Sequence, residues 1–227
     1  MRVGEERALL RSIAAALSGL ALIAAGLPAR AEDQEDGRWV MPGKNVQGHR
    51  YSGLTEITPD NAKNLKVAWT FSLGVLKGQE AAPIVADNTM FVVSPYPNIL
   101  YALDLTKPGA ALKWKYEPKP DAAAQGVACC DVVNRGAVYA EGKVFFNTLD
   151  DHTIAVDAAS GKELWRTKLG EIAKGETMTM APLVVRGKVL VGNSGGEMGC
   201  AAGSPRSTRI AARSRGAPTA PAPIRTC

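Results

Sequence analysis

The stretch Leu100–Asp104 (LYALD), followed by a turn through Gly109 and then by Leu112–Trp114 (LKW), occurs twice in this chain. Its second copy is Thr153–Asp157 (TIAVD), followed by a turn and then by Glu163–Arg166 (ELWR). The two Asp residues lie 53 positions apart, and the two Trp residues lie 51 positions apart. A repeat of this period indicates a fold built from similar units that stack against one another.

Two more short strands are predicted ahead of each Asp, because apolar and β-branched residues cluster there between turn signals. Four short strands per unit of about 50 residues, with a Trp on the last strand, are typical of a propeller blade. We therefore predict an all-β fold, a β-propeller of four-stranded blades; an ordinary β-sandwich would leave the repeat unexplained. The added strands are Ala82–Val85 and Met90–Ser94, then Arg135–Tyr139 and Lys143–Asn147, with Ala181–Val185 and Lys188–Gly192 opening a third unit.

One predicted strand stands ahead of the repeat, and another is the last one predicted in it. Leu65–Leu73, which contains Trp69, is expected to be a lone strand that completes the last blade and closes the ring. Lys188–Gly192 is expected to be an open edge strand, a feature that exposes unpaired backbone groups.

The amino terminus has the layout of an export signal. Three Arg residues precede an apolar run, Ile13–Leu27, and Ala29-Arg30-Ala31 supplies small residues for a signal peptidase. The alternative is a membrane anchor, but the run is about 15 residues long, whereas a spanning helix needs roughly 20. We therefore expect residues 1–31 to be a cleaved signal peptide and the rest to fold in an oxidising compartment.

Residues 200–227 differ from the rest of the chain, since they contain no aromatic or acidic residue and show neither a helical nor a strand period. One interpretation is a disordered basic tail. The other is a frameshift near Gly199, because permitted codons for this tail read ALDADSGKIAWR in a neighbouring frame. That string aligns with Ala155–Arg166 as a third copy of the repeat.

The net charge of +5 is uneven along the chain. Residues 1–31 carry four Arg and two Glu, residues 200–227 carry five Arg and no acid, and the middle has 18 basic against 20 acidic residues. The basic character therefore comes from the two ends. Composition gives no support for nucleic-acid binding by the folded part.

Cys129 and Cys130 are adjacent. A disulfide between neighbours forces a strained eight-membered ring, and such strain usually marks a functional site. The alternative is a pair of free, buried thiols.

Three motifs resemble the pyrroloquinoline-quinone-dependent alcohol dehydrogenases of the methanol dehydrogenase type. Within that family, their residues are most similar to those of the lanthanide-dependent branch. They are Gly78–Pro83 (GQEAAP), Gly126–Gly136 (GVACCDVVNRG) and Gly192–Gly199 (GNSGGEMG), and the segments Asn45–Ser52 and Leu54–Asn61 also resemble that family. The resemblance covers residues 38–199. Its members are eight-bladed propellers of around 600 residues, so residues 32–199 would form about the first two and a half blades of a truncated propeller.

The resemblance implies a role for each site residue. Cys129 and Cys130 would form the ring disulfide against one face of the quinone, and Arg135 would be a cation for its carboxylate and carbonyl oxygens. Glu80 would hydrogen-bond the cofactor edge, and Thr179 and Ser194 would donate hydroxyls. Without the family, a surface Arg, a solvated Glu and an ordinary Ser-Gly-Gly turn would be the simpler interpretations.

Glycines and one carboxylate complete the implied set. Gly195 and Gly196 would let the backbone approach the cofactor closely, and Glu197 would be the first ligand of calcium or a lanthanide ion. The ion would polarise the quinone during base-assisted hydride transfer from a primary alcohol. His49 and His152 have no metal-ligand spacing, and we interpret both as structural.

The implied function is that of a periplasmic alcohol dehydrogenase that passes electrons to a cytochrome c, often as a homodimer, with no membrane contact after signal cleavage. The catalytic base and the other metal ligands lie downstream in the family, so we expect the truncated chain by itself to be inactive. The alternative is a propeller scaffold of the outer-membrane assembly type, which shares the repeat but would have no use for Cys129, Cys130 and Arg135.

Overall fold

The structure is a computed structural model that describes residues 37–128, 131–195 and 209–213. The described residues all fall within one compact unit that begins at Gly37. The predicted signal peptide, Cys129, Cys130, Gly196 and Glu197 lie outside the described residues.

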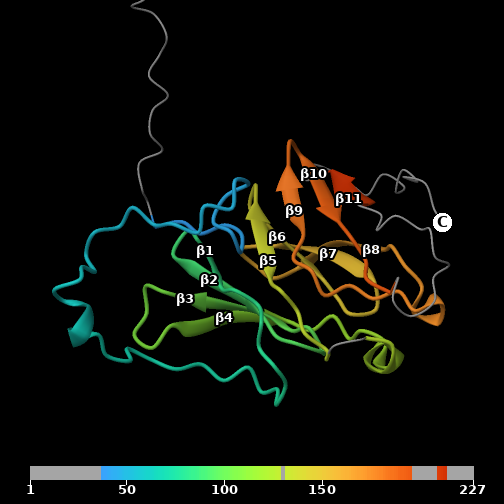
Figure 1. Cartoon of the computed structure of the whole chain (residues 1–227), viewed down its shortest axis with the longest axis horizontal. Helices are drawn as coiled ribbons and strands as arrows, with labels where there is room; N and C mark the ends of the chain where they lie inside the picture. Colours follow the sequence, from blue (N-terminus) through green and yellow to red (C-terminus); the bar gives the residue numbers. More distant parts are fainter. Residues whose placement is uncertain (1–36, 129–130, 196–208, 214–227) are drawn as a thin grey trace, which may run out of the picture. The chain divides into compact units, whose positions relative to one another are not determined.

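Two four-stranded antiparallel sheets confirm the predicted blades (Figure 1). Each is a meander in which every strand pairs with the next along the chain. The repeated Asp ends the third strand in both sheets, and the repeated Trp lies on the fourth. The first sheet is β1 (Ile84–Ala86), β2 (Thr89–Val93), β3 (Leu100–Asp104) and β4 (Ala111–Tyr116), and the second is β5 (Ala137–Ala140), β6 (Lys143–Asn147), β7 (His152–Asp157) and β8 (Glu163–Lys168).

The third sheet contains one strand that the sequence analysis missed. It consists of β9 (Leu183–Val185), β10 (Lys188–Val191) and β11 (Arg209–Arg213), in the order β11-β10-β9. The expectation of an open edge at Lys188–Gly192 is therefore wrong, because β11 pairs with β10 from Lys188 to Val191. A ladder is made by backbone N–H and C=O groups, so β11 forms without the alternation of apolar residues that marks a strand in a sequence.

The prediction of a lone strand at Leu65–Leu73 is wrong for the described residues. This segment follows a short 3₁₀ helix, η1 (Ala62–Asn64), and runs alongside the first sheet without joining it (Figure 1). It contacts the sheet through Tyr101, whose hydroxyl donates to Leu73 O at 2.8 Å and whose ring meets Phe71 edge-on. A strand is defined by a hydrogen-bonded neighbour, and no described sheet edge supplies one here.

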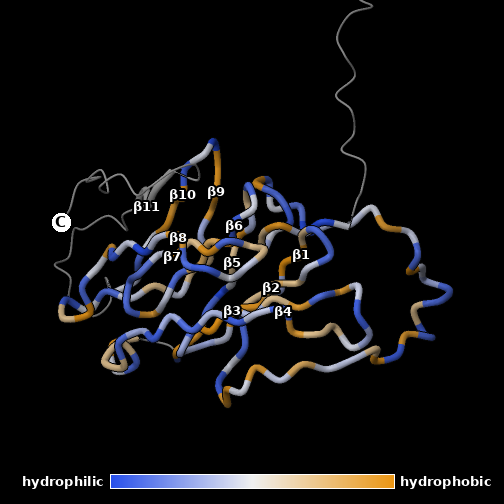
Figure 2. The backbone as a smooth tube through the Cα atoms, turned by 180° about the vertical axis from the view of Figure 1, so that it is seen from behind, coloured by the Kyte–Doolittle hydropathy of each residue, from blue (hydrophilic) through white to orange (hydrophobic). Residues whose placement is uncertain are grey.

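The second sheet lies between the other two and is buried on both faces. Along β6, Val144 and Phe146 pack in the cluster shared with the first sheet, while Phe145 between them packs against β10 of the third. Successive strand residues point to opposite faces, which explains why β6 is apolar without alternation (Figure 2). Burying a Phe side chain in this way stabilises the fold by roughly 1.5–3 kcal/mol.

The repeated Trp joins neighbouring sheets. The Trp114 indole N–H donates to Ala158 O at 3.2 Å, just after the repeated Asp of the second sheet. Gly161 makes room for the ring, because a Cβ built there would lie 2.6 Å from Trp114 Cδ2. Trp165, the matching residue of the second sheet, is buried, and its N–H has no hydrogen-bond partner among the described residues.

The described helices are all short 3₁₀ turns, and none is long and apolar enough to cross a membrane. Besides η1, they are η2 (Ala122–Gly126) and η3 (Ile172–Lys174). The helix η2 begins with a side-chain cap, since Asp121 accepts from Ala123 N. Both η2 and η3 lie in the connections that run from one sheet to the next.

Candidate functional site

Three predicted site residues lie at equivalent places in the repeat. Glu80 comes shortly before β1, Arg135 shortly before β5, and Thr179 shortly before β9. These are the first strands of the three sheets, and they contact one another in order. A parallel bridge between Ala82 and Gly136 aligns the first two segments, so these residues meet at one end of the stacked sheets.

Arg135 connects the other two residues. Its guanidinium Nη2 lies 3.3 Å from Glu80 Oε2, and its Nη1 donates to Thr179 Oγ1 at 2.5 Å. The backbone N–H of Arg135 also donates to Thr179 O at 2.9 Å. The Arg135 and Glu80 side chains are about half exposed, so the cation is fixed by two neighbours while one side remains open to a ligand.

This cluster can offer both charge and directional hydrogen bonds. Arg135 presents further N–H donors suited to carboxylate or carbonyl oxygens. Because Thr179 Oγ1 accepts from Arg135, the Thr179 hydroxyl keeps its own proton for another acceptor. The arrangement suits an anionic ligand with several oxygen acceptors.

Ser194 follows the end of β10 and pairs with Thr177 through an isolated antiparallel bridge, and its hydroxyl faces Thr177. Backbone bonds join the two residues in both directions, at 2.8 and 3.3 Å. The Ser194 hydroxyl is 2.9 Å from Thr177 Oγ1 and 2.9 Å from Thr177 O. Ser194, a predicted hydroxyl donor, is therefore held by Thr177, which lies two residues before Thr179.

Gly195 is required by its immediate backbone contact. A Cβ built at Gly195 would lie 2.1 Å from Gly175 O, and its φ is +122°. Gly175, which ends η3 with a φ of +82°, is therefore in close approach to Gly195. Gly195 thus lies close to a second chain segment, and the close approach to a cofactor that the resemblance implies stays a prediction.

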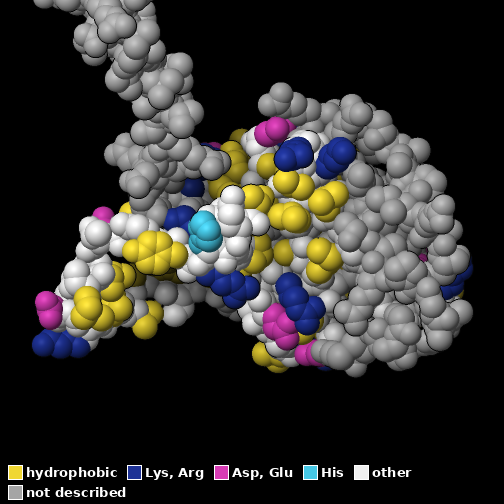
Figure 3. All heavy atoms as spheres, turned by 45° about the horizontal axis from the view of Figure 1, so that its top comes forward, with side chains coloured by type: hydrophobic (Ala, Val, Ile, Leu, Met, Phe, Trp, Pro, Cys, Tyr) yellow, Lys and Arg dark blue, Asp and Glu magenta, His cyan; other side chains and the backbone are white. Residues whose placement is uncertain are grey.

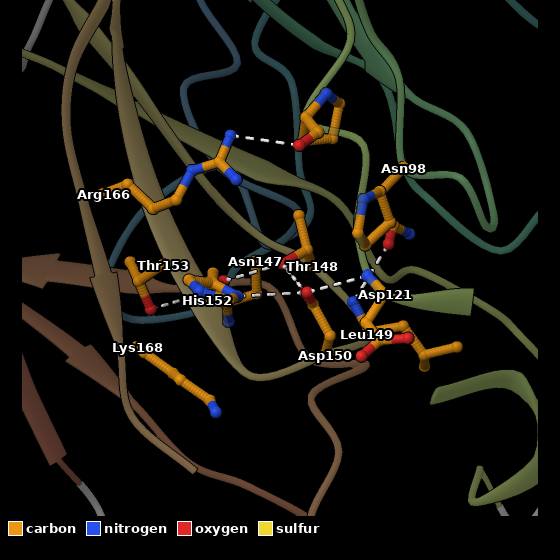
Figure 4. Close-up of polar contacts among 12 residues, drawn as sticks. Asn98, Asp121, Asn147, Thr148, Leu149, Asp150, His152, Thr153, Arg166 and Lys168 are labelled. Carbon is orange, nitrogen blue, oxygen red and sulfur yellow. Dashed lines mark hydrogen bonds and ion pairs between the residues drawn. The ribbon is translucent and has the colours of Figure 1, made fainter. Parts of the chain in front are cut away.

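A buried amide network behind the cluster was not found from the sequence. Asn134 Nδ2 donates to Asn147 O at 2.9 Å, and Asn147 Nδ2 donates to Met180 O at 3.0 Å. The Asn147 Oδ1 atom accepts from Thr153 Oγ1 at 2.8 Å (Figure 4). Since Asn134 precedes Arg135 and Met180 follows Thr179, the network fixes the backbone on both sides of the cluster. The sequence feature that could have indicated this network is Asn147, a polar residue at the end of a mostly apolar strand.

Gln79 was also missed. Its Nε2 donates to Ala81 O at 3.2 Å and to Val93 O at 3.1 Å. These two bonds tie the segment around Glu80 to the end of β2.

A second polar cluster surrounds Asp150 in the turn between β6 and β7 (Figure 4). Asp150 accepts from Thr148 Oγ1 at 2.6 Å and from Asp121 N at 3.0 Å, and it lies 3.2 Å from His152 Nδ1. Burial raises the pKa of Asp150, but these hydrogen bonds outweigh burial and lower the pKa to about 2. His152 therefore lies beside a carboxylate that is charged at neutral pH, and the structural role expected for His152 stays a prediction.

The described residues contain no cluster of three or more His, Cys, Asp or Glu side chains able to hold a metal ion. The predicted metal ligand Glu197 is outside this part of the chain. On the face shown in Figure 3, Lys, Arg, Asp and Glu side chains alternate around small hydrophobic patches. On this face the coloured side chains therefore include both signs of charge, close to one another.

Comparisons with known proteins agree with the fold. Residues 39–207 match the family model described as the glucose/ethanol/alcohol dehydrogenase β-propeller domain of the PQQ type. A lanthanide-dependent methanol dehydrogenase of Methylacidiphilum fumariolicum is 54% identical over 167 residues, covering 74% of this chain and 27% of the relative. Methanol dehydrogenase [cytochrome c] subunit 1 of Methylobacterium organophilum is 44% identical over 198 residues, covering 81% of this chain and 32% of that protein.

Solved structures give the same result. A europium-containing methanol dehydrogenase superposes with a TM-score of 0.69 at 55% identity, over 70% of this chain and 28% of that one. The quinohemoprotein alcohol dehydrogenase of Comamonas testosteroni gives a TM-score of 0.71 at 34% identity, over 82% of this chain and 27% of that one. The chain thus spans less than a third of the length of these relatives. On the strength of the blade repeat and these matches, the chain belongs to the PQQ family of glucose, ethanol and alcohol dehydrogenase β-propellers.

Proposed function

We propose that this chain provides the amino-terminal part of the cofactor site of a periplasmic, PQQ-dependent alcohol dehydrogenase that oxidises a primary alcohol and passes electrons to a cytochrome c. The observation that carries the proposal is the contact of Arg135 with both Glu80 and Thr179. The names of the relatives, which include methanol dehydrogenases linked to cytochrome c, support the substrate and the acceptor.

The described residues fit the cofactor in charge and in hydrogen-bonding type. Pyrroloquinoline quinone has three carboxylates and two quinone oxygens, all of them acceptors. Arg135 supplies a cation and several N–H donors, and Thr179 retains a hydroxyl proton. Glu80 would neutralise part of the Arg135 charge and keep the guanidinium in one orientation.

Once bound, the quinone would supply the two-electron acceptor that protein side chains lack. The residues of this chain would bind and orient it: Arg135 and Thr179 at its oxygen atoms, with Glu80 holding Arg135. We further propose Cys129 and Cys130 as a disulfide against the cofactor, Gly196 as a site of close approach, and Glu197 as a ligand of calcium or a lanthanide ion. We also propose that the Ser194 hydroxyl donates a hydrogen bond to the cofactor, as the Thr179 hydroxyl does.

The test is a titration of the full 227-residue chain with pyrroloquinoline quinone, followed by quenching of Trp fluorescence. Arg135→Gln should raise the Kd at least about tenfold, because a hydrogen bond to a charged group contributes roughly 1.5–3 kcal/mol. Lys188→Gln, which removes a positive charge at the beginning of β10, is the matched control. Equal affinity in both variants, or no binding by the unsubstituted chain, would contradict the proposal.

The proposed disulfide and export are tested together. Expression with residues 1–31 in a Gram-negative host should give a periplasmic product that lacks this segment. A non-reduced digest should then contain a Cys129–Cys130 peptide lighter by two hydrogens than its reduced form. Two alkylatable thiols in the exported product would count against the disulfide.

A further inference from the structure

Thr177 is buried, with 3% of its surface exposed, and its hydroxyl lies 2.9 Å from the hydroxyl of Ser194. The Ser194 hydroxyl also lies 2.9 Å from Thr177 O. A hydroxyl has a single proton, so if Ser194 donates to Thr177 O, Thr177 must donate to Ser194 Oγ. The two side chains and two backbones are thereby joined by four hydrogen bonds.

This joint is connected directly to the Arg135 cluster. Thr177 and Thr179 lie on one extended segment, and Thr179 holds Arg135 through both its side chain and its carbonyl. The same segment therefore carries the contact to Ser194 at one residue and the contact to Arg135 two residues later. Gly195, the residue after Ser194, packs closely against Gly175, two residues before Thr177.

We propose that Thr177 is a positioning residue of the cofactor site, which fixes the Ser194 hydroxyl relative to Thr179 and Arg135. This inference rests on the proposed function. When Ser194 turns its proton toward a ligand, the Thr177 hydroxyl still donates to Ser194 Oγ. A donor hydrogen-bonded in this way becomes a stronger donor itself, so Thr177 would both orient Ser194 and strengthen its bond to an acceptor.

Three variants of the full chain separate this role from general stability. Thr177→Val keeps the shape and removes the hydroxyl, whereas Thr177→Ser keeps the hydroxyl and should restore function. Thr148→Val is the control, because Thr148 is equally buried and its hydroxyl bonds to Asp150, in the turn between β6 and β7 (Figure 4). If quinone affinity fell only because a buried hydrogen bond is missing, it would fall in both Val variants.

The first measurement needs no cofactor. Hydrogen exchange at the Ser194 amide, which donates to Thr177 O at 2.8 Å, should be faster in Thr177→Val than in Thr177→Ser or Thr148→Val. The second is the quinone titration. Thr177→Val should raise the Kd about fivefold to tenfold, which is the worth of one neutral hydrogen bond, while Thr177→Ser and Thr148→Val should match the unsubstituted chain.

The outcomes are distinguishable. Unchanged exchange at Ser194 in Thr177→Val overturns the inference, and so does faster exchange with an unchanged Kd, which would make the joint purely structural. A rise in Kd of the same size in Thr148→Val overturns it as well. Failure of the unsubstituted chain to bind quinone contradicts the proposed function itself, and with it the role of Thr177.

Discussion

Gly195 occupies a position that a larger residue cannot take without moving the backbone. An added Cβ would meet Gly175 O at 2.1 Å, and the φ of +122° is itself unfavourable for other residues. We predict that Gly195→Ala destabilises the chain by roughly 1–3 kcal/mol, measured as the free energy of unfolding in urea.

Gly142→Ala separates the clash from the backbone strain. Gly142 has a φ of +73°, but a Cβ there would meet nothing within 4 Å. Gly142→Ala should therefore lower the free energy of unfolding only by the cost of the backbone strain, about 1 kcal/mol. Equal losses in the two variants would show that the approach to Gly175 is unimportant.

Asp150 should make stability depend on pH at the acid end. Its pKa is about 2 in the folded chain, where burial is outweighed by hydrogen bonds from His152, Thr148 and Asp121 N. Because this pKa lies below the usual value of about 3.9, the contribution of the carboxylate is fully present above pH 4 or so and is lost as the pH falls toward 2.

Asp150→Asn should therefore lower the Tm at pH 6 and have a smaller effect at pH 2.5. Thermal unfolding followed by circular dichroism between these pH values measures both. The matched control is Asp60→Asn, since Asp60 is exposed. A Tm difference from the unsubstituted chain that stays constant with pH would refute the assignment.

Among the elements, β4 and β8 carry the same Trp in different surroundings. Trp114 on β4 donates to Ala158 O in the next sheet, whereas the buried N–H of Trp165 on β8 has no partner among the described residues. Trp→Phe removes the N–H in both cases. We predict a larger loss of stability for Trp114→Phe than for Trp165→Phe, by about 1 kcal/mol in urea unfolding, because only the first variant breaks a hydrogen bond.

A similar loss in the two variants would show that ring size, rather than the bond to Ala158, determines how the sheets dock. A larger loss for Trp165→Phe would mean that its N–H has a partner in the native chain. Either result would alter our account of how neighbouring blades are joined.

At the scale of the whole molecule, we propose that residues 200–227 are read from a shifted frame. The shifted string ALDADSGKIAWR would give the third unit an Ala equivalent to Ala158, which is the residue that accepts from Trp114. The carbonyl of that Ala could accept a hydrogen bond from the Trp165 N–H, which has no partner among the described residues. β11 occupies the place beside β10 that the third strand of a blade takes in the first two sheets.

The prediction is tested at the DNA level. Sequencing the locus should show codons around and beyond Gly199 that encode the ALDA and AWR strings in an adjacent frame. Codons that cannot encode them would end the proposal. In that case β11 would be the natural third strand of this sheet.

The sequence by itself determined the blade. The positions and the order of the strands in the first two sheets follow from local patterns of apolar residues, turns and the spacing of Asp and Trp, and these patterns repeat along the chain. Motif resemblance also indicated Glu80, Arg135 and Thr179, although nothing in their local sequence showed that they meet.

Only the tertiary structure decided which of these residues touch and what holds them. The bonds of Thr177 to Ser194, of Asn147 to Met180 and of Gln79 to Val93 join segments that are distant in sequence, and a single polar residue has no periodicity to reveal its partner. Tertiary structure also decided that β11 is a strand and that Leu65–Leu73 is not. Whether a segment becomes a strand depends on the free backbone edge beside it, and that edge exists only after the sheets have stacked.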